Sequence, residues 1–264
     1  MLMSSLSEKK YREKEGLFLA EGLKLFREAA ACGMSAELVA VHEDRRDLLE
    51  TVTGLMPDTP VYVLSDSAFS KVSSESAPQG IITAVRFPRE LHSVIRFVSG
   101  AVPEDCIFPK PDMGKAIALE SVRDPGNLGT VIRSAAAFGI GTVILSADCA
   151  DIYNPKTVRG AMGALFSTRI VRVSDLGAAI DALNRSGRRT FAAALMPGAA
   201  AFGSFELKAD DVFVIGNEGH GLSEEVINAC REPVFIPMRT GPGIESLNAA
   251  VAASVIMFGL SGKN

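Results

Sequence analysis

The stretch Val212-Phe-Val-Ile-Gly-Asn-Glu-Gly-His-Gly-Leu-Ser223 indicates the fold class of this chain. Its first four residues form an uninterrupted apolar run, which is typical of a strand buried on both faces. Gly216, Gly219 and Gly221 follow, and glycines at the end of a strand allow the main chain to approach a ligand closely or to adopt positive φ. Their order is not that of the dinucleotide-binding fingerprint, and a glycine-rich loop alone also fits a tight turn.

Short apolar runs like this one recur along the second part of the chain, separated by helical patterns. They are Ile117–Glu120, Thr142–Leu145, Ile170–Val173, Thr190–Leu195, Val212–Gly216 and Val234–Pro237. Strands that alternate with helices predict an α/β fold with a mostly parallel sheet, because each parallel pair needs a crossover. Ligands of such sheets bind beyond the carboxyl ends of the strands. The loops of interest therefore follow Glu120, Leu195, Gly216 and Pro237.

The N-terminal part has the pattern of a smaller α/β unit. Strands are expected at Leu17–Ala20, Glu37–Val41, Pro60–Leu64 and Gly80–Arg86, and helices at Leu23–Ala31, Arg45–Thr51 and Asp66–Val72. The stretch from Ser99 to Lys115 is rich in proline and glycine and has no period, which predicts a linker. We therefore expect a small α/β domain at residues 1–98, a linker at 99–115 and a larger domain at 116–264.

Composition excludes several classes of protein. Apolar residues make up 47% of the 264 residues and charged residues 22%, as in folded globular proteins. The apolar run Ala249–Leu260 is shorter than the roughly 20 residues that span a bilayer, and the N-terminus lacks the apolar core of a secretory signal. We expect no membrane segment and a cytoplasmic location. The net charge of −4 requires any nucleic-acid site to be local.

The four cysteines, Cys32, Cys106, Cys149 and Cys230, lie far apart and form no Cys-x-x-Cys pair. Neither a zinc site nor a disulfide framework is suggested, and four separate buried thiols are expected.

Two helices begin directly after candidate ligand loops. Asp124-Pro125-Gly126 predicts a turn, after which Asn127 can cap a helix whose apolar face excludes Arg133. Taken alone, Arg133 also fits an ordinary exposed helix arginine. Ser246 has the character of an N-cap for the small-residue helix Ala249–Phe258, which suits close packing in the core or at a subunit interface.

Three motifs in order resemble those of the SpoU (TrmH) family of RNA methyltransferases. They are Asn-x-Gly-x-x-x-Arg at 127–133, Gly-x-Glu-x-x-Gly at 216–221, and Ile-Pro-Met followed by Glu-Ser-Leu-Asn at 236–248. Order, spacing and flanking strands agree from about Ala116 to the C-terminus. The N-terminal stretch from Lys9 to Gly22, with Ala77-Pro-Gln-Gly-Ile81, looks like the family's ribosomal-protein-like substrate-binding domain over a shorter match.

The resemblance implies that the C-terminal segment threads through a loop to form a deep trefoil knot, and that the chain is a homodimer with its active site at the subunit interface. It implies transfer of a methyl group from S-adenosylmethionine to a ribose 2′-hydroxyl, without a metal. The family's knot loops hold the methyl donor mainly by main-chain groups. Carried over, the donor-binding residues are Leu195, Gly216, Ile236, Met238 and Leu247.

Arg133 matches the family's arginine beside the reacting ribose, which is often proposed to accept the hydroxyl proton. Because a guanidinium pKa above about 12 makes a neutral arginine costly, stabilisation of the developing alkoxide or action through a substrate phosphate are alternatives. The polar positions that orient the arginine, the RNA and the donor would be Asn127, Glu218, Ser246 and Asn248.

Basic residues in two places are expected to contact RNA. Arg159 lies in a segment that resembles the family's RNA-facing turn, although Arg-Gly-Ala here replaces the commoner Arg-Ala-Ser. Lys9, Lys10 and Arg12 form a cluster suited to phosphate contacts, while interleaved glutamates also fit a solvated helix face. By resemblance, the separate N-terminal domain favours ribosomal RNA over transfer RNA.

Other functions remain as alternatives. A non-catalytic RNA-binding protein could keep the fold, although the intact Arg133, Glu218 and Asn248 argue against it. A nicotinamide-dependent oxidoreductase lacks its glycine fingerprint, and a phosphate-loop enzyme is disfavoured because Ala116 follows Gly114-Lys115.

Overall fold

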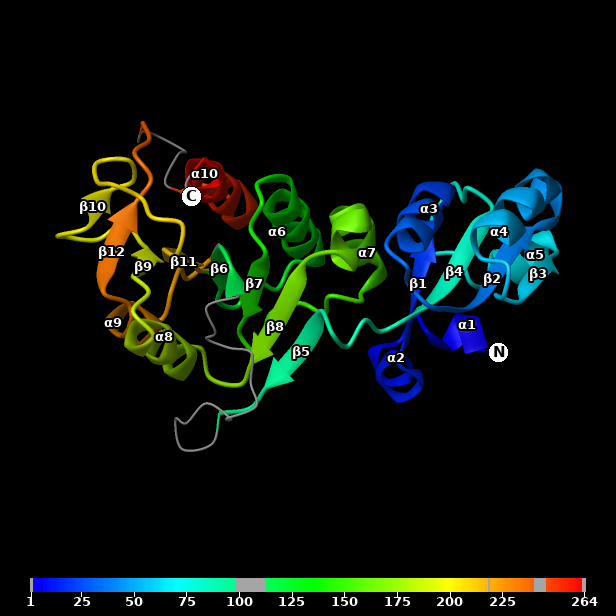
Figure 1. The fold of residues 1–264 in the computed structure, drawn as a ribbon, viewed down its shortest axis with the longest axis horizontal. Coiled ribbons are helices and arrows are strands. Elements are labelled where there is room, and N and C mark those ends of the chain that lie inside the picture. Colours follow the sequence, from blue (N-terminus) through cyan, green and yellow to red (C-terminus); the bar gives the residue numbers. More distant parts are fainter. Residues whose placement is uncertain (1, 98–112, 218, 240–245, 263–264) are drawn as a thin grey trace.

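The computed structural model describes residues 2–97, 113–217, 219–239 and 246–262. The chain forms an elongated molecule with a four-stranded sheet in its N-terminal part and an eight-stranded sheet in the remainder (Figure 1). Within the described residues, no helix is both long and apolar enough to cross a bilayer.

The smaller sheet has the strand order β1 (Leu17–Glu21), β4 (Ile81–Arg86), β2 (Ala36–His42) and β3 (Val61–Leu64). Strand β4 is antiparallel to both neighbours, whereas β2 and β3 are parallel. The surrounding helices are α1 (Leu2–Ser5), α2 (Lys9–Glu15), α3 (Leu23–Ala31), η1 (Glu43–Leu48), α4 (Leu49–Leu55) and α5 (Asp66–Phe69). The expected strands are confirmed, but the helix expected at Arg45–Thr51 is a 3-10 helix followed by α4, because Arg45 has non-helical dihedral angles.

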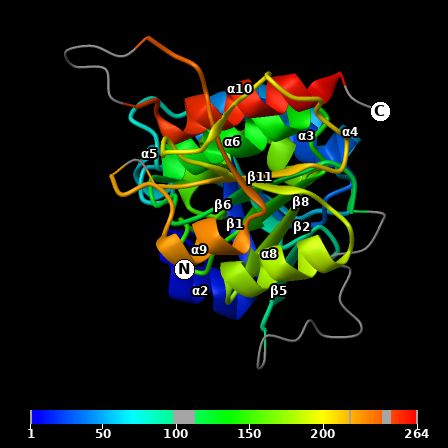
Figure 2. The same ribbon diagram turned by 90° about the vertical axis from the view of Figure 1, so that its left-hand side faces the viewer.

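The larger sheet is parallel throughout, as its alternating pattern predicts. Its strand order is β10 (Ala200–Ala201), β12 (Glu232–Phe235), β9 (Thr190–Ala193), β11 (Val212–Ile215), β6 (Ala116–Leu119), β7 (Thr142–Leu145), β8 (Arg169–Val173) and β5 (His92–Ile95). Strands β6, β7 and β11 are buried along their whole length because helices cover both faces. One face carries α6 (Pro125–Ala137), α7 (Pro155–Ala161), η3 (Met162–Phe166) and α10 (Ala249–Ser261), and the other α8 (Leu176–Arg185) and α9 (Glu224–Ala229) (Figure 2).

The two sheets divide the chain at a different place from the expected boundary. Residues 92–95 form β5, which pairs with β8 at the edge of the larger sheet, although they lie inside the domain expected at 1–98. Residues 99–112 of the expected linker lie outside the described part of the chain. Strand β12 also begins two residues before the expected Val234 and ends at Phe235, so that residues 236–238 belong to the following loop.

The two halves share one apolar core. Phe18 of β1 contacts Tyr153 and Phe166 of the larger unit at ring-centroid distances of 4.7 Å and 6.3 Å. Phe87, directly after β4, stacks on Tyr153 at 3.9 Å. A buried ion pair between Arg12 and Asp151, 2.6 Å apart, lies beside this aromatic group. The relative position of the sheets is therefore held by side-chain packing as well as by the chain itself.

Candidate active site

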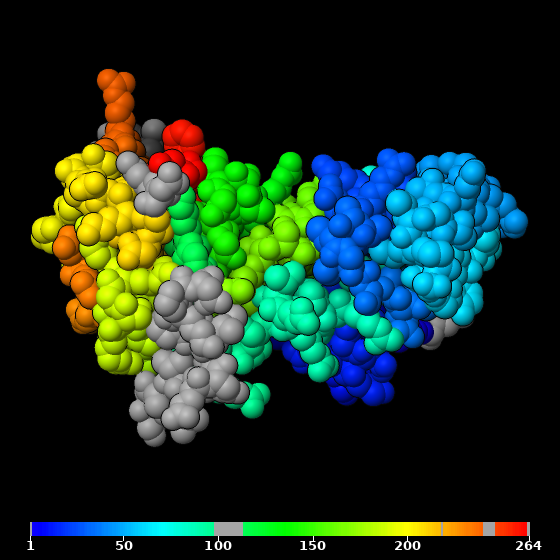
Figure 3. Space-filling model, in the orientation of Figure 1, coloured from blue at the N-terminus to red at the C-terminus, as the bar shows by residue number. Residues whose placement is uncertain are grey.

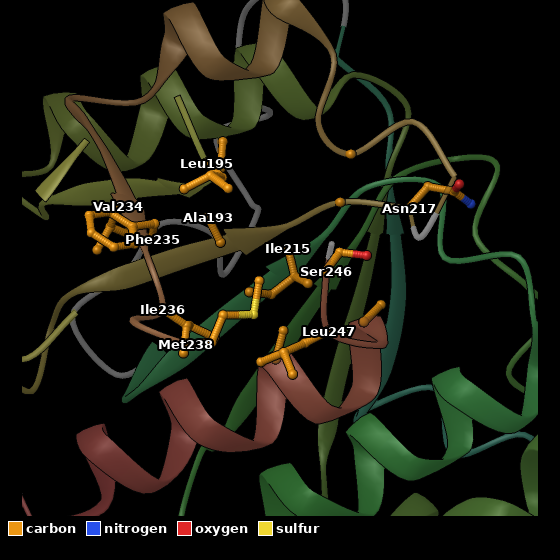
Figure 4. Close-up of a pocket in the computed structure, with 15 residues that line it drawn as sticks. Ala193, Leu195, Ile215, Asn217, Val234, Phe235, Ile236, Met238, Ser246 and Leu247 are labelled. Carbon is orange, nitrogen blue, oxygen red and sulfur yellow. The ribbon is translucent and has the colours of Figure 1, made fainter. Parts of the chain in front are cut away.

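The loops at the carboxyl ends of β9, β11 and β12 meet the start of α10 around a pocket of about 300 Å³ (Figure 4). The five expected donor-binding residues all line it: Leu195, Gly216, Ile236, Met238 and Leu247. Ser246 and Asn217 line it as well. Figure 4 shows Leu195 on one side of this space, with Met238 and Leu247 on the opposite side. Elements far apart in sequence thus form one mainly apolar site at the sheet edge where ligands of parallel sheets bind.

Gly216 is fixed by the close approach of two main-chain segments. A Cβ atom built at this position would lie 2.3 Å from the carbonyl carbon of Gly221 and 2.5 Å from the nitrogen of Leu222. The loop between them closes on itself, because Asn217 and Gly221 exchange main-chain hydrogen bonds of 3.1 Å and 2.8 Å. No other residue fits here without moving the main chain, which makes Gly216 a structural requirement of the pocket wall.

Asn217 connects this loop to the loop after β6. Its Nδ2 donates to the carbonyl of Ser121 at 2.9 Å, and its Oδ1 accepts from the nitrogen of Gly219 at 2.7 Å. Ser121 has a φ of 54°, an uncommon value for a residue with a side chain, and its Oγ donates to Asp148 at 2.6 Å. Burial raises the pKa of Asp148, but hydrogen bonds from Ser121, Ser146 and Arg123 outweigh it and leave that pKa well below its usual range. The ionised Asp148 therefore holds the strained turn that leads into α6.

Asn217 lies inside the second motif, but the resemblance assigns it no role. The signal was present in the residue type, since asparagine next to glycines at a strand end commonly forms side-chain to main-chain bonds in a turn.

The helices α6 and α10 are joined at their N-termini by an asparagine pair. Asn248 Nδ2 donates to Asn127 Oδ1 at 3.1 Å, and Asn248 Oδ1 accepts from the nitrogens of Ala250 and Val251. The resemblance grouped Asn127 with Asn248, and the structure brings them together. Asn127 belongs to the first motif and Asn248 to the third, and the neighbours of Asn248 in sequence, Leu247 and Ala249, line the pocket. The bond between the two asparagines therefore links the start of α6 to the pocket wall.

Both expected N-caps are wrong by a few residues. The N-cap of α6 is Asp124, whose Oδ1 accepts from the nitrogen of Asn127, so Asn127 lies in the first turn of the helix. The N-cap of α10 is Asn248 and not Ser246, which precedes the helix and is exposed. In α6 the physical reason is Pro125, which suits the first helical position and places the cap directly before it.

Arg133 lies on the exposed face of α6, as the helical wheel predicts. Glu218 lies outside the described residues. The structure therefore brings Asn127, Asn248 and Ser246 to the region of the pocket, while the catalytic roles of all five expected residues remain predictions.

The residues expected to contact RNA differ in their surroundings. Arg12 is only 3% exposed and donates to Asp151 and to the carbonyls of Leu6 and Ser7. These contacts, of which the one to Asp151 crosses to the larger unit, bury the guanidinium, so the interpretation of Arg12 as an exposed phosphate ligand is wrong. Lys9 and Lys10 are exposed on α2, and Lys9 lies 3.6 Å from Glu13.

Arg159, in α7, contacts the smaller unit. Its Nη1 donates to Glu75 at 2.5 Å and to Ser74 Oγ at 3.3 Å, yet its side chain remains 44% exposed. An exposed guanidinium remains accessible to a phosphate, so this position stays a prediction.

Among the described residues, no group of three or more histidine, cysteine, aspartate or glutamate side chains is arranged to hold a metal ion. Cys149 and Cys230 are buried, but Cys32 is exposed, contrary to the expectation of four buried thiols, and Cys106 lies outside the described part.

Comparison with known proteins agrees with this geometry. The profile of the SpoU rRNA Methylase family matches residues 114–258, which contain every element that lines the pocket. The chain belongs to the SpoU rRNA methylase family. A second profile, the MRM3-like substrate binding domain, matches residues 2–83.

Relatives of known name extend over nearly the whole SpoU chain. The 23S rRNA (guanosine(2553)-2′-O)-methyltransferase RlmP of Bacillus subtilis is 31% identical, with 97% of this chain and 93% of the relative covered. The 23S rRNA (uridine(2479)-2′-O)-methyltransferase of Streptomyces viridochromogenes is 28% identical, with 96% and 85% covered. The crystal structure of the SpoU methyltransferase AviRb from the latter organism, in complex with AdoMet, superimposes with a TM-score of 0.80 at 27% identity and covers 98% of this chain and 95% of AviRb.

Proposed function

We propose that this SpoU-family chain transfers the methyl group of S-adenosylmethionine to a ribose 2′-hydroxyl of ribosomal RNA. The observation that carries the proposal is the pocket at the carboxyl ends of β9, β11 and β12, which residues of the second and third motifs line and to which the bond from Asn248 to Asn127 joins the first motif. Relatives that cover nearly the whole chain are named as 23S rRNA 2′-O-methyltransferases, which supports the same reaction.

The pocket residues fit the methyl donor. Leu195, Ile236 and Leu247 provide apolar contacts for an adenine ring, and the loops that carry them present main-chain donors and acceptors to the same space. Gly216 lines the pocket without a side chain, so a ligand can approach its main chain there. Bound there, the donor supplies a methyl group already activated by its sulfonium, and no metal or covalent nucleophile is required.

The protein then has to orient the ribose and accommodate negative charge on its oxygen. Arg133 is the candidate for the second task, because a guanidinium carries a positive charge and can donate to a developing alkoxide or hold a neighbouring phosphate. The pair formed by Asn127 and Asn248 positions the N-terminus of α6, on which Arg133 lies, relative to the pocket. Glu218 and Ser246 complete the set proposed to orient the RNA and the donor.

A homodimer is part of this proposal. The helix α10 packs Ala253, Ile256 and Met257 into the core, while Val251, Val255 and Phe258 remain 49%, 39% and 68% exposed on its other side. These three residues recur at helical spacing and form a continuous apolar stripe, which a second copy of the chain would cover. Phe258 also contacts Phe138, the C-cap of α6, so the stripe reaches the end of the helix that carries Arg133.

The trefoil knot is proposed for the same segment. After strand β12, near one edge of the sheet, the chain returns as α10 to pack on β11 and α6 in its middle, as a threaded segment would. A cytoplasmic location completes the proposal.

The test begins with donor binding measured by calorimetry in the presence of a chelator, where affinity in the micromolar range is expected. Loss of binding that a divalent ion restores would overturn the metal-free site. Mapping of 2′-O-methyl positions in ribosomal and transfer RNA, from cells with and without the gene, then identifies the substrate. One lost methylation in ribosomal RNA is expected. A lost transfer RNA site would replace the ribosomal assignment, and donor binding with no lost site would favour a non-catalytic RNA-binding protein.

A further inference from the structure

A second cavity, of about 230 Å³, lies where the N-terminal unit meets the edge of the larger sheet. Its walls come from α2, from the segment between β4 and β5, from β5 and β8, and from the loop before α7. In Figure 3 the segment that leads into β5 (teal) lies on the surface between the dark blue N-terminal helices and the green part of the larger sheet. None of its residues lines the donor pocket, so it is a separate site.

The cavity has a net positive charge in a protein whose net charge is −4. Lys9, Arg12, Arg89 and Arg172 line it, against Glu13 and Asp151. Asp151 is neutralised by the buried Arg12, and Glu13 lies 3.6 Å from Lys9. Two positive charges therefore remain without a carboxylate partner.

Arg89 and Arg172 are these two residues. Arg172 donates to the carbonyls of Ser146, Ala147, Cys149 and Ala150, which hold its guanidinium in place without cancelling its charge. Arg89 is exposed, and its side chain has no hydrogen bond or ion pair with any described residue. An exposed, unpaired guanidinium beside a fixed one suits a phosphate group.

The remaining lining is apolar and aromatic. Val94 on β5 is 66% exposed, an unusual fraction for an apolar side chain on a strand, and Phe87 is half-buried with its ring stacked on Tyr153. An apolar floor with an aromatic wall and a cationic rim is the combination that binds a nucleotide, since the base packs on the rings while the phosphate meets the charges.

We propose that this cavity binds one nucleotide of the RNA substrate, at a distance from the nucleotide that is methylated. The base occupies the floor beside Val94 and Phe87, and its phosphate contacts Arg89. The inference rests on the proposed function, because it takes the RNA to be the substrate. It adds a second anchoring point, which fixes how the RNA crosses from the N-terminal unit to the active site.

The experiment compares RNA binding by Arg89→Ala with that of Arg185→Ala, a change of an exposed arginine at the end of α8, on the other face of the sheet. Both proteins are first shown to melt at the temperature of the unchanged chain and to bind S-adenosylmethionine normally. Arg89→Ala is expected to weaken affinity for a ribosomal RNA fragment about tenfold and to reduce the slope of log affinity against log salt by about one.

Ultraviolet crosslinking of the bound RNA, followed by peptide mapping, tests which residues contact the base. Adducts are expected on peptides that contain Phe87 or Tyr153. The proposal is overturned if Arg89→Ala behaves as Arg185→Ala does, or if affinity falls while the crosslinks map elsewhere, which would leave a surface phosphate contact only. In either case the unchanged chain still methylates RNA. Absence of methylation by the unchanged chain would instead count against the proposed function.

Discussion

Gly216 is the residue at which the donor pocket is least tolerant of change, because main-chain atoms of Gly221 lie where its Cβ would be. Gly216→Ala must displace the loop from Asn217 to Gly221, and we expect it to weaken S-adenosylmethionine binding at least tenfold by calorimetry. The matched control is Gly54→Ala on α4, where an added Cβ meets nothing within 4 Å and the φ angle is ordinary. That control should bind the donor normally and be more stable by about 0.4–1 kcal/mol. Normal donor affinity in Gly216→Ala would contradict the assignment.

Arg133 allows a test of the chemistry itself. Arg133→Lys keeps the charge but loses the planar set of donors, so single-turnover methyl transfer with saturating enzyme should slow on the order of 10²–10³-fold. Donor affinity should be retained, and the loss should appear in kcat with little change in KM for RNA. Near-normal methyl transfer by the lysine variant would return Arg133 to the class of ordinary exposed helix residues.

At the level of single residues, the resemblance named five residues that line one pocket, whereas it named Arg12 as an exposed RNA contact and the structure buries that side chain. Leu195, Gly216 and Met238 could be placed through the resemblance, and strand-end reasoning points to the same loops because the carboxyl ends of parallel strands meet at one edge of the sheet. Arg12 could not, because the residue that removes it from the surface, Asp151, lies 139 positions away. A local pattern of mixed charges contains no information about such a partner.

Among the elements, α10 depends on Asn248 for its N-terminus. Asn248→Ala removes the acceptor for the nitrogens of Ala250 and Val251, and should lower the free energy of unfolding by about 1 kcal/mol. Asn248→Asp keeps that acceptor but loses the Nδ2 donor to Asn127. Chemical denaturation should therefore show a deficit for Asn248→Ala and little for Asn248→Asp, while both slow methyl transfer. Full activity of Asn248→Asp would show that the asparagine pair has no catalytic consequence.

His92, on strand β5, makes the free energy of unfolding depend on pH. Burial lowers the pKa of His92, at the start of β5, from 6.5 to about 4, and its Nδ1 lies 2.8 Å from the hydroxyl of Tyr153. The unfolded chain binds a proton at His92 more readily than the folded chain does. The stability that neutral His92 contributes is therefore complete above pH 6.5 and is lost progressively as the pH falls towards 4. From pH 7 to pH 5 the loss is on the order of 2 kcal/mol.

The measurement is urea denaturation at pH 7 and pH 5 for the unchanged chain and for His92→Asn, which cannot titrate. The variant should be less stable at pH 7 but should lose less stability on acidification. An equal loss in both proteins would assign the pH dependence to other groups.

The elements that sequence analysis did not predict are those without a local signal. The strand β10 has two residues and β5 has four, and β5 contains a histidine and a serine where an apolar run would be expected. Both exist because a neighbouring strand offers unpaired main-chain groups: β8 for β5 and β12 for β10. The buried strands β7 and β11 also have four residues each, but they could be located within two residues from their apolar runs alone.

For the whole molecule, the exposed stripe on α10 predicts the assembly. Phe258→Asp places a charge in the middle of the proposed dimer interface, and we expect sedimentation to show a monomer where the unchanged chain is a dimer. Phe258 does not line the donor pocket, so donor binding should persist if that pocket is complete within one chain. Val63→Asp, at the exposed edge of the smaller sheet, is the matched control and should remain dimeric. A dimer in both variants would exclude this face.

The pairing of β5 with β8 has a consequence for how such chains can recombine in evolution. A crossover between two related genes at residue 98 or 114 would join a β5 from one parent to a β8 from the other. The two paired strands at this edge of the sheet would then come from different parents. A crossover between Arg86 and His92 leaves that edge intact, but it still separates Phe18 from Tyr153. Exchange of N-terminal units among relatives should therefore succeed only where Phe18, Phe87 and Tyr153, which contact one another across the two units, are inherited together.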